Sequence, residues 1–230
     1  MTTCYFPNNE FDSQIWPAET LEKSTDIRDK ILSLNCVGQK IKELRFIGFC
    51  YSFEDFMMEF IARSQLRKRN LTEEQLREYS KYSNIPDDIE FDRDFEIDRP
   101  FLIKFENGDV FEIVCPMASE FRIGMNSIPW NIDFGTDEQN CDANILLSPC
   151  LNHKIVDFKL NLHTSSANGG VDSIAFILDN GLKLVIGGWI DYCIVTLKDA
   201  NNKVLPIKFG ELKKGLFDFT DTNCDEQNDF

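Results

Sequence analysis

The sequence has few of the residues that build catalytic and metal sites. Its 230 residues include only two histidines, and none of its eight cysteines is separated from another by the two residues typical of zinc knuckles and redox motifs. It contains no serine or cysteine framed by glycines and no glycine-rich phosphate loop. The chain therefore has no recognisable catalytic motif, and no cofactor or metal is expected.

Long apolar runs are also missing, and basic residues are outnumbered by acidic ones. No stretch approaches the roughly 18 apolar residues of a membrane span, and the amino terminus lacks the basic and apolar regions of a signal peptide. We therefore expect a cytoplasmic protein with free thiols. Lys and Arg number 24 against 39 Asp and Glu, so neither a nucleic acid nor a membrane is expected as a partner.

The net charge of −15 is concentrated in two segments. Residues 84–98 carry seven carboxylates against one arginine, and residues 218–230 carry five carboxylates and no base. The second segment is predicted to be a disordered tail. The acidity is therefore local, and the first segment needs an explanation of its own.

Two hairpins are the clearest structural signals in the chain. Apolar and polar residues alternate over residues 101–114 around Asn107-Gly108, and again over residues 174–186 around Asn180-Gly181. Asn-Gly tolerates the two positive φ angles of a tight type I′ turn, so each pair is predicted to form one. The hydrophobic fraction of 43% and twenty phenylalanines supply enough apolar material for a core.

Three short segments recur in the same order in both halves of the chain. Residues 40–46 match 154–160, residues 105–108 match 178–181, and residues 132–135 match 207–210. The offset between the copies falls from 114 to 73 and 75 residues, which places an insertion of about 41 residues in the first copy. We therefore predict an α+β fold, mostly β, made of two tandem antiparallel β-meander units that arose by internal duplication, with a helical insertion in the first.

The predicted organisation has four parts. They are an N-terminal segment with one helix (1–35), a first β unit with a helical and acidic insertion at about 52–98 (36–148), a second β unit (149–217) and the acidic tail (218–230). The first helix is predicted to begin at Pro17 and end near Asn35. In the insertion, a helix over residues 53–69 precedes a shorter one that opens with a capping box at Thr72–Gln75.

The insertion ends in a strict alternation of carboxylates with other residues. The carboxylates are Asp88, Glu90, Asp92, Asp94, Glu96 and Asp98, which we call the acidic ladder. The residues between them are Ile89, Phe91, Arg93, Phe95 and Ile97. Because successive side chains of a strand point to opposite faces, an extended conformation places all six carboxylates on one side.

Three functions are consistent with the acidic ladder. Its charge would protect an edge strand against pairing with other sheets, attract a basic protein partner, or bind calcium. Carboxylates on a straight strand lie about 6–7 Å apart in a row rather than a cage, which argues against calcium.

The hypothesis that the protein is an enzyme depends on candidate residues that are scattered along the sequence. The sequence spacing does not match a known zinc-site pattern for Cys150 and His153, with Cys141 and His163 nearby. An enzyme would otherwise need a site assembled from distant carboxylates such as Asp133, Asp157 and Asp191. A hydrolase or transferase built from such carboxylates or from Cys and His is the alternative hypothesis.

The sequence as a whole favours a non-enzymatic cytoplasmic binding module that engages a basic partner surface through the acidic ladder. Inhibitors and immunity proteins of intracellular toxins are similar in composition, because they are also small, acidic and free of catalytic motifs. This similarity is one of composition alone.

Overall fold

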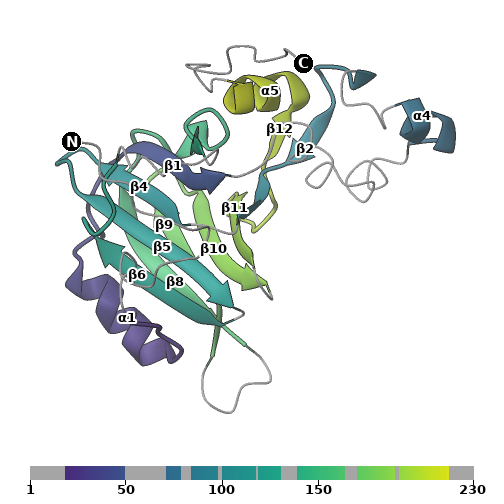
Figure 1. Cartoon of the computed structure of the whole chain (residues 1–230). Coiled ribbons are helices and arrows are strands. Elements are labelled where there is room, and N and C mark those ends of the chain that lie inside the picture. Colours follow the sequence, from purple (N-terminus) through teal and green to yellow (C-terminus); the bar gives the residue numbers. More distant parts are fainter. Residues whose placement is uncertain are drawn as a thin grey trace, which may run out of the picture.

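Two antiparallel sheets of five strands face each other in the computed structural model, which describes residues 19–49, 71–78, 84–97, 100–117, 119–130, 139–163, 170–189 and 192–217. The strand orders are β6-β5-β4-β1-β7 and β3-β11-β10-β9-β8, and β12 and β2 form a separate pair. In Figure 1 the teal strands of the first sheet lie in front of the green strands of the second. The predicted α+β, mostly β, fold is confirmed.

The bounds of the strands and helices are as follows. The first sheet contains β1 (Ile41–Phe49), β4 (Phe101–Phe105), β5 (Val110–Met117), β6 (Glu120–Met125) and β7 (Gln139–Asp142). The second contains β3 (Asp94–Ile97), β8 (Ile155–Leu162), β9 (Val171–Leu178), β10 (Lys183–Trp189) and β11 (Tyr192–Lys198). The remaining elements are β2 (Glu90–Asp92), β12 (Pro206–Lys208), α1 (Ser24–Ser33), α4 (Glu73–Glu78), α5 (Phe209–Phe217) and the 3-10 turn η2 (Ser148–Cys150).

Aromatic side chains fill the space between the sheets. Phe111 of β5 lies edge-on against Phe176 of β9 with ring centroids 5.5 Å apart, and Phe46 of β1 lies 5.7 Å from Phe95 of β3. All four rings are buried, and burying each one stabilises the fold by about 1.5–3 kcal/mol. Helix α1 contacts β6 and β8 and so closes one open side of the sandwich.

The two four-stranded meanders, β1-β4-β5-β6 and β8-β9-β10-β11, repeat each other in register. Ile41 faces Phe105 in the first and Ile155 faces Leu178 in the second, and a register shift follows at once in both. The two units meet at an antiparallel bridge between Lys40 and Lys154, the residues that precede β1 and β8. That the units arose by duplication stays a prediction.

Both hairpin turns form where they were predicted, but their type differs. A type I′ turn needs positive φ at both central residues, whereas only the glycines have it, with φ of +93° at Gly108 and +82° at Gly181. The amide of each glycine donates to the carbonyl three residues earlier, at 3.0 Å and 2.9 Å. The type I′ prediction is therefore wrong, and each loop has the single left-handed glycine of a turn followed by a bulge.

The first helix and one strand differ from the predictions. Helix α1 begins at Ser24 rather than Pro17, because Leu21 exchanges two backbone hydrogen bonds with Phe121 and is extended. Residues 139–142, for which the sequence analysis named no strand, form β7, which pairs with β1. The predicted helix over residues 53–69 lies outside the described residues.

The second insertion helix begins as predicted. The Thr72 hydroxyl accepts a hydrogen bond from the Gln75 amide at 3.2 Å, and the Gln75 side chain accepts one from the Thr72 amide at 2.9 Å. This reciprocal pair is the capping box that opens α4. None of the described helices is long and apolar enough to cross a membrane.

The glycine conformations give a matched test of the repeated hairpins. Gly108→Ala and Gly181→Ala should each lower the free energy of unfolding by about 1 kcal/mol, because both residues have positive φ. A Cβ at either position meets nothing within 4 Å, so the cost is conformational and similar at both sites. Gly187→Ala should cost more, since its Cβ would lie 2.8 Å from the Asp172 carbonyl. Urea denaturation measures all three, and unequal costs at Gly108 and Gly181 would contradict the equivalence of the turns.

Candidate functional site

The acidic ladder is extended, but it is divided between two strands. β2 ends at Asp92 and pairs with β12, whereas β3 begins at Asp94 and pairs with β11 at the edge of the second sheet. A single strand through Arg93 was expected, so that part of the prediction is wrong.

The predicted alternation of the ladder is present in the burial of its side chains. Phe91, Arg93, Phe95 and Ile97 are buried. The carboxylates of the described ladder residues reach solvent, with Asp88, Glu90 and Glu96 exposed and Asp92 and Asp94 partly exposed. Asp98 lies outside the described residues.

Arg93 is turned into the protein at the point where the ladder divides. Its Nε donates to the Leu146 carbonyl at 2.7 Å, and its Nη1 donates to the Pro206 carbonyl. Its Nη2 lies 3.6 Å from the half-exposed carboxylate of Glu211. Burial lowers the pKa of Arg93 and the charge of Glu211 raises it, and the guanidinium remains a cation. The one basic side chain of this acidic segment therefore has its partners inside the fold rather than among the ladder carboxylates.

The outer face of the second sheet carries part of the ladder along one border. The register places Asp94, Thr196, Val185, Ala175 and Lys159 in one row across the five strands. Asp94 accepts a hydrogen bond of 2.5 Å from the Thr196 hydroxyl, which holds its carboxylate on this face. The row therefore runs from a carboxylate at one edge of the sheet to an ammonium group at the other.

The cysteine and histidine candidates do not form a reactive pair. Burial raises the pKa of the Cys150 thiol to about 12, although the charge of Arg93 lowers it, so the thiol is protonated at neutral pH. The His153 ring lies 2.7 Å from the exposed carboxylate of Asp179, a contact that lowers the pKa of Asp179. His163 lies 4.0 Å from a different carboxylate, that of Asp172.

The scattered carboxylates are not brought together either. Asp157 is exposed on β8 and accepts a hydrogen bond from the neighbouring Phe158 amide at 2.8 Å. Asp133 and Asp191 lie outside the described residues, and nothing is described of the Cys141 side chain. In the part of the chain that the structure describes, no group of three His, Cys, Asp or Glu side chains is placed to hold a metal ion.

A buried carboxylate on β5 was not found from the sequence. Glu112 is 1% exposed, and one of its oxygens accepts a hydrogen bond of 2.5 Å from the Ile128 amide, while Oε2 has no hydrogen-bond partner among the described residues. Burial is the main cause that raises its pKa, and hydrogen bonds from Ile128 and Ser127 partly oppose it. One feature of the sequence could have indicated this burial: Glu112 lies between Val110 and Val114, and all three side chains are buried on the same face of β5.

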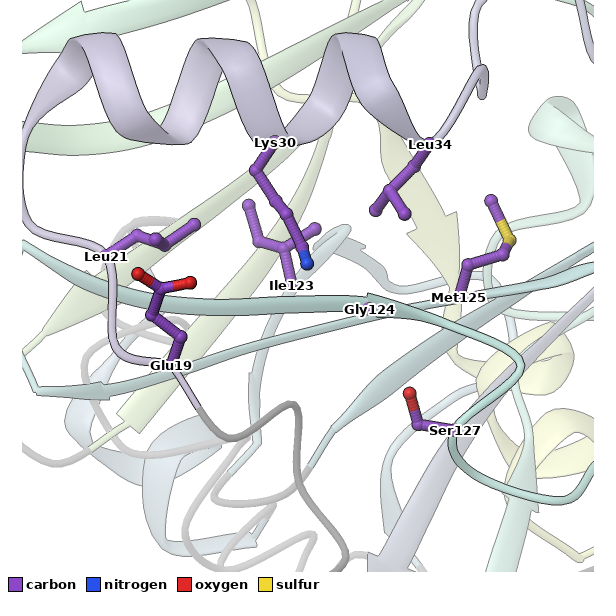
Figure 2. A pocket seen from close by; sticks show the side chains of 8 residues that line it. All are labelled: Glu19, Leu21, Lys30, Leu34, Ile123, Gly124, Met125 and Ser127. Atoms are coloured by element: carbon purple, nitrogen blue, oxygen red, sulfur yellow. The ribbon is translucent and has the colours of Figure 1, made fainter.

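A pocket of about 350 Å³ opens between α1 and β6 (Figure 2). Its apolar lining consists of Leu21, Leu34, Ile123 and Met125, together with the backbone of Gly124. Glu19, Lys30 and Ser127 add polar groups, and the Lys30 side chain extends from α1 toward β6 (Figure 2). No residue of this pocket was singled out by the sequence analysis.

Comparison of the chain with models of protein families, with curated proteins and with solved structures found no match. The function is therefore argued from the residues of this chain alone.

Arg93 gives a test of how the ladder segment is held. Arg93→Met should lower the free energy of unfolding by about 3 kcal/mol, because it removes two charged hydrogen bonds, a buried one to the Leu146 carbonyl and a partly buried one to the Pro206 carbonyl. Glu211→Gln should cost less than about 1 kcal/mol, since that carboxylate is half exposed. Both are measured by urea denaturation, and equal costs would contradict the role given to the two carbonyls.

Glu112 should make stability depend on pH. Its pKa is raised in the folded protein, so the free energy of unfolding should fall as pH rises from the unfolded value of about 4.3 through the folded pKa, and then level off. Glu112→Gln keeps an acceptor for the Ile128 amide and removes this dependence, so the variant should gain stability relative to wild type as pH rises. Denaturation at several pH values measures the difference, with Glu120→Gln on a partly exposed position of β6 as the control. A difference that does not change with pH would contradict the buried ionisation.

Proposed function

We propose that this protein is a non-enzymatic, cytoplasmic binding protein that engages a basic surface of a protein partner through its acidic ladder. One observation carries the proposal. The described ladder carboxylates reach solvent, while the buried side chain of Arg93, the one base among them, donates its hydrogen bonds to backbone carbonyls. The segment therefore presents its negative charge outward without an arginine of its own to neutralise it.

Such a surface acts on a partner over some distance. At physiological ionic strength charges interact over about 8 Å, so several carboxylates along β2 and β3 produce a joint field in front of the strands. A field of this kind accelerates association with a basic surface and disfavours acidic partners more than it adds affinity. An inhibitor or immunity protein directed at a basic toxin would use a surface of this kind.

Protection of the sheet edge is compatible with this proposal. β3 is an edge strand, and charge on an edge opposes pairing with the strands of other molecules. A basic surface is attracted by the same charges that keep other strands away. The ladder therefore serves both purposes with one set of side chains.

The combined variant Asp92→Asn, Asp94→Asn and Glu96→Gln tests the proposal. It should remain folded, as judged by circular dichroism and thermal unfolding, and should lose a partner that wild type captures from an extract of the source cells. Capture by wild type should weaken as the salt concentration rises from about 0.05 to 0.5 M, because surface charges are screened.

A second triple variant controls for the change in net charge. Glu22→Gln, Asp26→Asn and Asp29→Asn remove the same number of negative charges from exposed positions on and before α1. This variant should capture the partner as wild type does. Retained capture by the ladder variant, or equal loss in both variants, would sink the proposal.

A further inference from the structure

The outer edge of β6 is only partly covered. Leu21 and Phe121 exchange two backbone hydrogen bonds, of 2.7 Å and 2.9 Å, so the N–H and C=O groups of Phe121 point away from β5. The backbone groups of a strand alternate in direction, so those of Ile123 and Met125 also point away from β5. In the part of the chain that the structure describes, the Leu21 pairing does not extend to them.

Two observations support this direction for Ile123 and Met125. Asn126 is one residue beyond Met125, so its backbone groups should point the other way, toward β5. Its amide does donate a hydrogen bond to the Val110 carbonyl of β5, at 2.8 Å. The pairing of β6 with β5 also runs without a register shift from Arg122 to Met125. Among the described residues, neither Ile123 nor Met125 has a backbone hydrogen-bond partner on the open side.

The pocket between α1 and β6 lies along this open edge (Figure 2). Leu34, the residue that follows α1, and Met125 of β6 form apolar walls, and Lys30 extends from α1 toward the strand between Leu21 and Leu34 (Figure 2). Within the described part of the chain, Lys30 has no ion-pair partner. Among the described residues, the groove therefore offers unpaired backbone groups, apolar surface and one cation, Lys30, with Glu19 as the one carboxylate of its lining.

We propose that the groove between α1 and β6 binds an extended peptide segment of a partner protein, which adds to the first sheet as a strand antiparallel to β6 and places an acidic side chain against Lys30. Main-chain hydrogen bonds to Ile123 and Met125 bind any extended segment. The apolar walls select apolar residues at alternate positions, because side chains of a strand alternate in direction. Lys30 selects the acidic residue by charge complementarity.

Other occupants fit the groove less well. If the Leu21 pairing continued, Pro17 would face Met125, and proline has no amide hydrogen to complete the ladder. A free peptide C-terminus would run toward Glu19 in the antiparallel direction, and two carboxylates repel each other. An internal segment of a partner avoids both problems. The groove and the acidic ladder belong to different sheets, so this inference does not depend on the function proposed above.

Selection from a displayed library of random peptides on the full chain provides the probes, and synthetic copies of the selected peptides are then titrated by calorimetry. The selected peptides should alternate apolar residues and carry one acidic residue. Met125→Pro should weaken their binding at least tenfold, because it removes an outward amide without removing a hydrogen bond to β5. Amide exchange at Ile123 and Met125 should slow when a peptide is bound.

Lys30→Glu gives a second variant that does not touch the strand. It should weaken binding of the acidic peptides at least tenfold and shift a new selection toward basic residues, which a structural role for Lys30 would not do. The ladder variant Asp92→Asn, Asp94→Asn and Glu96→Gln should bind the peptides as wild type does. The proposal is overturned by failure to enrich any peptide, by unchanged binding to folded Met125→Pro, or by an unchanged selection with Lys30→Glu. Slow exchange at Ile123 and Met125 in the free protein, or a dimer that Met125→Pro abolishes, would also overturn it, because the edge would then have another occupant.

Discussion

Every strand at the border of an open sheet has backbone N–H and C=O groups that need partners, and this constraint governs the surface of the protein. Three borders of the two five-stranded sheets meet it in different ways. β8 has register shifts near both ends and a lysine, Lys159, in its middle, which opposes pairing with a foreign strand. β3 is short and acidic. β6 is covered at one end by Leu21, and its stretch beside α1 has no backbone partner among the described residues.

The same need for backbone partners accounts for Arg93. Where the chain passes from β2 to β3, the carbonyls of Leu146 and Pro206 accept hydrogen bonds from Arg93, whose guanidinium offers several donors in a fixed arrangement. Filling this role draws the arginine away from the neighbouring carboxylates. The negative surface is therefore partly a result of how the interior is satisfied.

Features that depend on near neighbours in the chain were predictable from the sequence. The Asn-Gly hairpins, the capping box at Thr72 and the alternation of the ladder each rest on residues a few positions apart, and all three are present. The period of two specified which ladder side chains reach solvent, because successive side chains of a strand point to opposite faces and the apolar residues of the ladder segment take the buried one.

Features that depend on distant partners were not predictable. α1 starts late because Leu21 pairs with Phe121, about a hundred residues away, and β7 exists because β1 offers it an edge. The ladder divides at Arg93 because β11 and β12 belong to different sheets. Glu112 looked like an ordinary exposed residue of a hairpin, since burial of the outer face of β5 depends on the surrounding fold. Only the type of the hairpin turns was a local error.

The insertion in the first meander has a consequence for the order of folding. It separates β1 from β4 by 51 residues, whereas 8 residues separate β8 from β9, so closing the first meander costs roughly 1–2 kcal/mol more in chain entropy. β3, moreover, has to wait for β11, which a ribosome makes about a hundred residues later. We expect the second meander to form first and the carboxylate-bearing strand to stay unpaired during synthesis. In that interval its like charges would keep neighbouring nascent chains apart.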